Sequence, residues 1–211
     1  MNRSGTLKKL SLCYSLWMTT FRKSKLTEVT MHELMKGLQR EHKGHKQLLT
    51  LLEGKLERLK QNIPLDFNLL NDAVNYIENY AGRYHHPKED IIYHYMVDNQ
   101  LDPHKDFAKI IEEHTKLEQI SSQLLTSLQG ILLDAITSTS RFILELEEFI
   151  QVHKQHLHKE DTVIFPQIEQ NLTGDDWQKI LPQLPNQEDD PLFGTKVQAE
   201  YLELYHRLTE T

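Results

Sequence analysis

Four stretches of this chain carry apolar residues at helical spacing, and this repeated pattern constrains the fold more than any other feature. The stripes run over residues 34–59, 67–96, 107–132 and 142–163, and breakers such as Asn62-Ile63-Pro64 separate them. Four long amphipathic helices with short connections predict an all-α fold, namely an antiparallel up-down four-helix bundle followed by short C-terminal helices.

Each stripe is apolar except at one level, where histidine, or histidine with glutamate, interrupts it. If consecutive helices alternate in direction, these levels all lie roughly 15–20 Å from the same end of the bundle, at ~1.5 Å per residue. The predicted layer consists of His42, His85, Glu89, His114, His156 and Glu160. The stripes therefore predict a single polar layer inside an apolar bundle.

Two short runs supply the glutamates of this layer: residues 85–90, with the sequence HHPKED, and residues 156–161, with the sequence HLHKED. In each run a histidine precedes a glutamate by four residues, so that the imidazole and the carboxylate share one helix face about one turn apart. Each pair is suited to clamp one side of a metal ion. Two such pairs in one small helical protein suggest two metal ions that share carboxylates.

A buried layer of imidazoles and carboxylates has to be paired or coordinate metal, because uncompensated buried charge costs several kcal/mol or more. The metal-free alternative is a network of His–Glu hydrogen bonds, which the convergence of four stripes disfavours. Imidazole and carboxylate without thiolate suit iron, manganese or zinc. Two glutamates able to bridge favour a pair of irons over a structural zinc, which prefers a closed tetrahedron.

In these motifs, and in the run of residues 160–166 (EDTVIFP), the chain resembles the hemerythrin-like HHE cation-binding family over residues 32–171. The resemblance implies a non-heme di-iron protein in which Glu89 and Glu160 bridge the irons and the four histidines are terminal ligands. It also implies binding or sensing of oxygen, nitric oxide or iron, with oxygen or nitric oxide as the small partner. An alternative is a di-iron redox enzyme that acts on peroxide or nitric oxide, or that repairs iron–sulfur clusters under nitrosative stress. Whether the protein is an enzyme stays open at this point, and a non-catalytic role is favoured.

The chain departs from the oxygen-carrying hemerythrins it resembles. Those proteins have a second histidine one turn after the helix-three histidine, where this chain has Glu118, and their last pair ends in aspartate five residues on. Glu118 is either a seventh ligand or an exposed helix residue, and His153 either binds metal or hydrogen-bonds a ligand. His86 and Asp90 are predicted to lie behind the ligands or to face solvent. Pro87 either bends the second helix or marks its restart.

Composition limits the class of protein and predicts its domains. Residues 1–30 carry a net charge of +5 and the remaining body carries −12, so the body lacks the basic surface of a nucleic-acid binder. No apolar run is long enough to span a membrane, and a single cysteine, Cys13, fits the reducing cytoplasm. We expect three parts: a basic extension (1–30), disordered or a targeting segment, with Met31 as an alternative start; the bundle (31–173); and a helical tail packed on it (174–211). The oligomeric state is not predicted.

Overall fold

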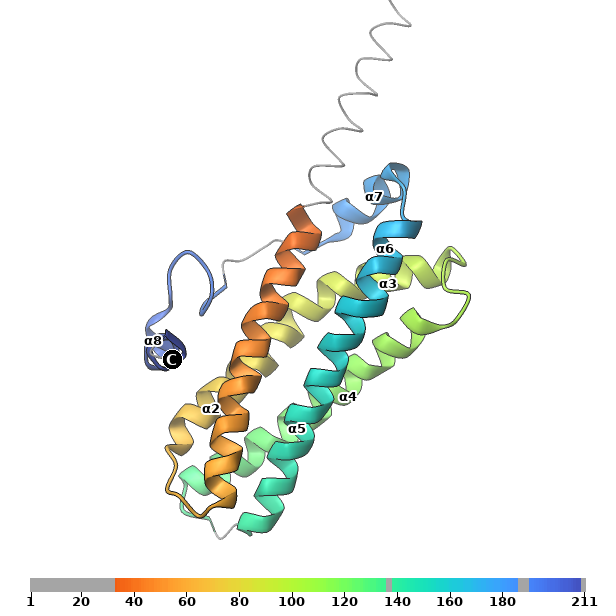
Figure 1. The fold of residues 1–211 in the computed structure, drawn as a ribbon. Coiled ribbons are helices and arrows are strands. Elements are labelled where there is room, and N and C mark those ends of the chain that lie inside the picture. Colours follow the sequence, from red (N-terminus) through yellow and green to blue (C-terminus); the bar gives the residue numbers. More distant parts are fainter. Residues whose placement is uncertain (1–32, 136–137, 186–189, 210–211) are drawn as a thin grey trace, which may run out of the picture.

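The computed structural model describes residues 33–135, 138–185 and 190–209, and all the regular secondary structure in these ranges is helical (Figure 1). The all-α prediction is therefore confirmed for the described part of the chain. None of these helices is both long enough and apolar enough to cross a membrane. The predicted N-terminal extension and Met31 lie outside the described residues, and the division into three parts remains a prediction.

Long helical segments lie side by side and form the body of the molecule (Figure 1). The first is helical over residues 33–60. The second consists of α2 (Phe67–Tyr76), the π-helix η1 (Ile77–His85) and α3 (His86–Asp98). The third is α4 (Asp106–Leu132), and the fourth consists of α5 (Thr139–Lys159), the π-helix η2 (Glu160–Ile164) and α6 (Phe165–Asn171). Helix α4 packs against α2, α3 and α5.

Short helices follow the fourth segment. They are α7 (Gly174–Ile180), η3 (Leu181–Gln183), η4 (Ala199–Tyr201) and α8 (Leu202–Thr209). A capping box between Thr173 and Asp176 begins α7. Helix α7 packs on α3 and α8 packs on α2, so the described parts of the tail lie against the bundle.

A hydrogen bond and a close ring contact join the C-terminal segment to the bundle, in addition to the packing of α8 on α2. The Tyr76 hydroxyl donates to Asp190 Oδ2 at 2.8 Å, and Asp190 Oδ1 accepts from the backbone N–H groups of Leu192 and Phe193, both at 2.8 Å. The Phe193 ring lies over Gly44, where an added Cβ would be 2.6 Å from Phe193 Cδ2. The close approach of this ring therefore requires glycine at position 44.

The buried apolar side chains form two clusters. The larger cluster includes Leu52 and Leu56 from the first segment, Leu70 and Val74 from the second, Leu124 and Leu128 from the third, and Leu146 and Phe149 from the fourth. The smaller cluster includes Met35 and Leu38, Ile92 and Met96, Phe107 and Ile110, and Ile164 and Ile168, in the same order of segments. The first and third segments contribute to the smaller cluster first and then to the larger one, and the second and fourth segments do so in the reverse order. The predicted polar layer lies between the two clusters.

Each π-helix ends two residues before a proline, η1 before Pro87 and η2 before Pro166. The His86 N–H donates to the carbonyl of Ala81, and the Phe165 N–H donates to the carbonyl of Glu160, five residues back in each case. A proline that follows has no N–H to donate and collides with the carbonyl four residues earlier, and a widened turn relieves this conflict. Of the two outcomes considered for Pro87, the structure has the restart: α3 begins at His86 with Pro87 in its first turn.

Candidate metal centre

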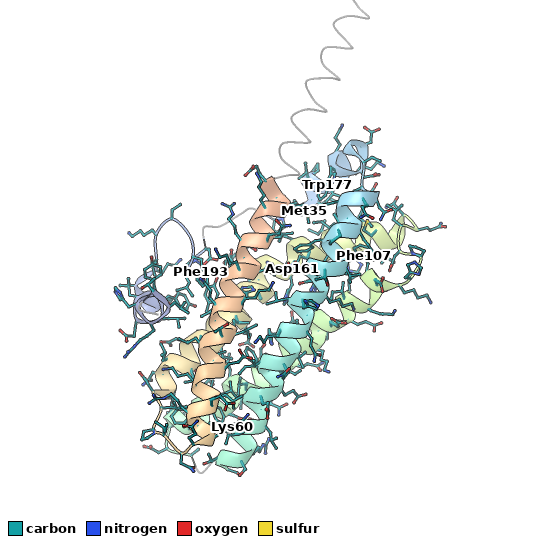
Figure 2. All side chains as sticks on the ribbon, viewed as in Figure 1. Met35, Lys60, Phe107, Asp161, Trp177 and Phe193 are labelled. Atoms are coloured by element: carbon teal, nitrogen blue, oxygen red, sulfur yellow. The ribbon has the colours of Figure 1, made fainter. Side chains whose placement is uncertain are left out.

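The six residues predicted for the polar layer lie together between the two apolar clusters, and all are at least 96% buried. Figure 2 shows the level of the layer through the labelled Asp161, with Met35, Phe107 and Trp177 toward one end of the bundle and Lys60 at the other. Each segment contributes at this level: His42 comes from residues 33–60, His114 from α4, and the two His–Glu pairs from the second and fourth segments.

One half of the layer joins His42 and His85 to both glutamates, and one ligand atom from each of the four lies within 4.8 Å of the others. The Nε2 atoms of His42 and His85 are 3.0 Å apart. His42 Nε2 is 3.4 Å from Glu89 Oε1 and 3.3 Å from Glu160 Oε2. His85 Nε2 is 3.2 Å from Glu89 Oε1. The ligand atoms of these four residues are therefore close enough together to bind one metal ion.

The other half contains His114 and His156. His114 Nε2 is 3.7 Å from Glu89 Oε2 and 3.5 Å from Glu160 Oε1. His156 Nε2 is 3.2 Å from Glu160 Oε2. Glu89 therefore directs one oxygen toward His42 and His85 and the other toward His114. Glu160 likewise lies between His42 on one side and His114 and His156 on the other.

This donor set fits metal cations. Ligand atoms bind such metals at about 2.0–2.2 Å, so neighbouring ligands at a right angle are about 3 Å apart. The distances of 3.0–3.7 Å between the donors of the layer are close to that spacing. Both Glu89 oxygens, Glu160 Oε2 and the Nε2 atoms of His114 and His156 have no hydrogen-bond partner among the described residues. Buried polar atoms of this kind cost about 1–3 kcal/mol each, and a cation satisfies them together.

A carboxylate lies behind each of the four histidines and accepts a hydrogen bond from its Nδ1–H. The pairs are His42 with Asp161 at 2.8 Å, His85 with Glu41 at 2.6 Å, His114 with Asp90 at 2.7 Å and His156 with Glu113 at 3.4 Å. Because Nδ1 carries the proton, the lone pair of Nε2 points into the layer. Metal-binding histidines are usually oriented in this way.

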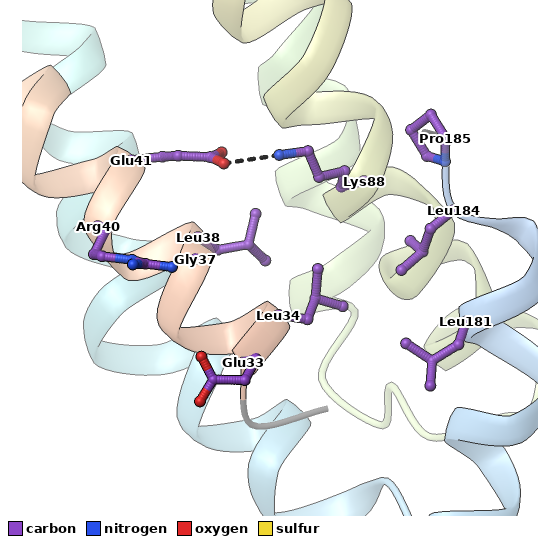
Figure 3. Close-up of a pocket in the computed structure, with 10 residues that line it drawn as sticks. All are labelled: Glu33, Leu34, Gly37, Leu38, Arg40, Glu41, Lys88, Leu181, Leu184 and Pro185. Atoms are coloured by element: carbon purple, nitrogen blue, oxygen red, sulfur yellow. Dashed lines mark hydrogen bonds and ion pairs between the residues drawn. The ribbon is translucent and has the colours of Figure 1, made fainter. Parts of the chain in front are cut away.

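Lysines hold three of these four carboxylates. Lys88 Nζ donates to Glu41 at 2.8 Å, Lys159 Nζ donates to Glu113 at 2.7 Å, and Lys46 donates to Asp161. Figure 3 shows the Glu41–Lys88 pair on the wall of a surface pocket between the start of the first helix and residues 181–185. Three of the four histidines are therefore oriented by a carboxylate that is itself held by a lysine.

The pKa shifts show how strongly the layer holds positive charge. Burial lowers the pKa of His114, but hydrogen bonds to Asp90 and Glu160 and the charge of Glu89 outweigh it and raise this pKa to about 10. Burial and the charge of Glu160 raise the pKa of Glu89, whereas His85 and His42 lower it to about 2. The carboxylates are therefore ionised at neutral pH, and a bound metal cation would take the place of the protons on the histidines.

The structure excludes one of the two placements predicted for His86. This side chain does not face solvent: it is 7% exposed, and its ring stacks on that of His114 with centroids 4.1 Å apart. His86, His114 and His156 form a second group whose ligand atoms lie within 4.8 Å of one another.

Asp90 lies behind His114, which is one of the two placements predicted for it. The roles of Glu41, Glu113 and Asp161 behind the other three histidines were not predicted. Glu118 is exposed and belongs to neither candidate metal group.

His153 and His45 are buried beside the layer. His153 belongs to neither group; its Nδ1–H donates to the carbonyl of Phe149 at 2.8 Å, and its Nε2 lies 3.5 Å from Ser121 Oγ. His45 is also outside both groups, and burial lowers its pKa well below the usual value.

The comparison with protein families agrees with this geometry. A family model described as the hemerythrin HHE cation binding domain matches residues 34–168, which include every residue of the polar layer. The chain belongs to this hemerythrin family. The description of this family names cation binding, and the described residues of the chain include buried His/Glu groups that could hold a metal ion. No curated protein and no solved structure matches the chain.

Proposed function

We propose that this hemerythrin-family protein is a non-heme di-iron protein. Glu89 and Glu160 bridge the two irons, His42 and His85 are terminal ligands of one, and His114 and His156 are terminal ligands of the other. The single observation that carries the proposal is that both glutamates are fully buried between two histidine pairs, with oxygens close to each pair. Carboxylates placed in this way suit two cations better than one.

The proposed fold is an antiparallel up-down four-helix bundle. It is supported by the alternating order in which the four segments visit the two apolar clusters. In such a bundle, inward-facing side chains of four helices meet at one level, which is how cofactor and metal sites in bundle cores are built.

A pair of irons is favoured over a structural zinc ion by the two carboxylates placed to be shared, and manganese is the less favoured alternative. Nitrogen and oxygen donors are compatible with all three metals. A structural zinc ion prefers four ligands in a closed tetrahedron, whereas the layer offers two shared carboxylates to two histidine pairs. Two histidines and the shared carboxylates would hold each iron, and iron held in this way would supply affinity for small exogenous ligands.

We propose that the protein binds or senses oxygen, nitric oxide or iron. Iron supplies the chemistry, namely reversible change of oxidation state and affinity for diatomic ligands. The protein orients the ligands through the carboxylates behind the histidines and excludes bulk water with the apolar clusters on both sides of the layer. The single cysteine, Cys13, supports action in the cytoplasm.

Metal analysis and absorption spectroscopy test this proposal. Protein from iron-supplemented cells should contain about two irons per chain and should show charge-transfer absorption that changes on addition of oxygen or nitric oxide. Stoichiometric binding supports a sensor or carrier, whereas rapid turnover of peroxide or nitric oxide supports the redox-enzyme alternative. One zinc, or no metal in a folded protein, would refute the di-iron proposal.

A further inference from the structure

The two faces of the polar layer differ in how their polar atoms are used. On the side of the smaller apolar cluster, the Tyr93 hydroxyl donates to Glu160 Oε1 at 2.8 Å. On the same side the Phe165 ring stacks on His42, with centroids 4.9 Å apart and planes 19° apart. This face of the layer is therefore covered by rings, and the polar atom of Tyr93 is satisfied.

The face toward the larger apolar cluster contains His45, one helical turn after His42. His45 is 4% exposed, and its Nε2 has no hydrogen-bond partner among the residues that the structure describes. Its ring meets the ring of His85 edge-on at 5.2 Å between centroids, and the rings of Tyr76 and Tyr80 at 6.1 and 6.3 Å. A buried imidazole nitrogen without a partner costs free energy, so its presence beside the layer needs an explanation.

His153, a second buried histidine on this face, provides a contrast. Both of its nitrogens have partners inside the protein, because Nδ1 donates to the Phe149 carbonyl and Nε2 lies within reach of Ser121 Oγ. Neither His153 nor His45 belongs to a candidate metal group. Of these two histidines, only His45 has a buried nitrogen, Nε2, with no hydrogen-bond partner among the described residues.

We propose that His45 binds the exogenous ligand of the metal pair, with its Nε2–H donating a hydrogen bond to that ligand. His45 contacts the edge of the His85 ring on the side of the larger apolar cluster, so this is the side of the layer on which the ligand meets His45. Its chemical class is a small molecule that accepts a hydrogen bond, such as oxygen or a small linear anion. This inference rests on the proposed metal pair. It adds the face of the layer on which the exogenous ligand binds and the residue that donates a hydrogen bond to that ligand.

Azide binding to the iron-loaded protein tests the role of His45, because azide is a small anion that accepts hydrogen bonds. His45→Phe keeps a ring of similar size and removes the donor, so its azide affinity should fall about tenfold, the equivalent of about 1.4 kcal/mol for one hydrogen bond to a charged group. His45→Gln keeps a donor and should lose less. The matched control is His153→Phe, which removes a buried imidazole from the same face and should leave azide affinity unchanged.

Vibrational spectroscopy provides a readout that a purely structural role would not change. The azide stretch of the wild-type complex should shift in heavy water, because N–D replaces the donating N–H, and the shift should vanish in His45→Phe. Unchanged affinity in His45→Phe, an equal loss in His153→Phe, or no shift in heavy water would overturn the assignment of His45. A wild-type protein that contains no pair of metals would refute the proposed function instead, so the two failures are distinguishable.

Discussion

Glu160 on η2 lies between His42 and His114, which come from two different helices, with Oε2 3.3 Å from His42 Nε2 and Oε1 3.5 Å from His114 Nε2. Its carboxylate is fully buried, Oε2 also lies 3.2 Å from His156 Nε2, and Oε1 accepts a hydrogen bond from the hydroxyl of Tyr93. One side chain thus links the two halves of the layer.

Replacing Glu160 by alanine should abolish metal binding in both halves of the layer. It should also destabilise the fold by about 3–5 kcal/mol, because the facing histidines lose their counter-charge and Tyr93 loses its acceptor. Metal analysis and urea unfolding measure the two effects. Glu118→Ala, a change of the same type at an exposed helix position, should keep both metals and stay within about 0.5 kcal/mol of the wild type. Retention of two irons by Glu160→Ala would show that the site is assigned wrongly.

Replacing Glu41 by glutamine should weaken metal affinity about 10–100-fold. The glutamine still fits the space but no longer supplies the negative charge that holds the Nδ1 proton of His85. Competition with a chelator of known affinity measures the change. Glu33→Gln, at an exposed position on the same pocket wall, is the matched control and should have no effect. Equal affinities in the two variants would contradict the role of Glu41.

Two glycines of the first helix should respond to alanine in opposite directions. At Gly44 the new Cβ would be 2.6 Å from the Phe193 ring, so Gly44→Ala should destabilise the protein by about 1–3 kcal/mol. At Gly37 nothing lies within 4 Å of the new Cβ, and alanine should stabilise the helix by about 0.5–1 kcal/mol. Thermal and urea unfolding measure both. If the cost at Gly44 arises from this contact, it should largely disappear in a Phe193→Ala background, and its persistence there would contradict the explanation.

The stability of the metal-free protein should fall as pH rises from about 6.5 to about 10. The pKa of His114 is about 10 in the folded protein, against about 6.5 for an ordinary histidine, and a raised pKa contributes stability that is complete below the unfolded value and is lost as pH rises through the folded value. The free energy of unfolding at several pH values tests this. His114→Gln should flatten the dependence, whereas His94→Gln at an exposed position should not. A metal-free protein that gains stability over this range would contradict the assignment.

The sequence predicted those parts of the structure that depend on periodicity. Apolar residues at 3.6-residue spacing identify the helices, and a histidine four residues before a glutamate places both on one face, as observed for His85 and Glu89. The sequence left two placements open for His86, because its angle from His85 around the helix does not tell which side chains pack against it. The carboxylates behind the histidines were missed for the same reason. Glu41 and Asp161 reach His85 and His42 from other helices, and such contacts appear only after the helices pack.

The central claim is that two metal ions share Glu89 and Glu160, and anomalous diffraction tests it most directly. Crystals of iron-loaded protein, measured on both sides of the iron absorption edge, should show two anomalous peaks in the buried layer, one beside His42 and His85 and the other beside His114 and His156, with both glutamates between them. A single peak in the layer, or peaks only at surface residues, would contradict the claim.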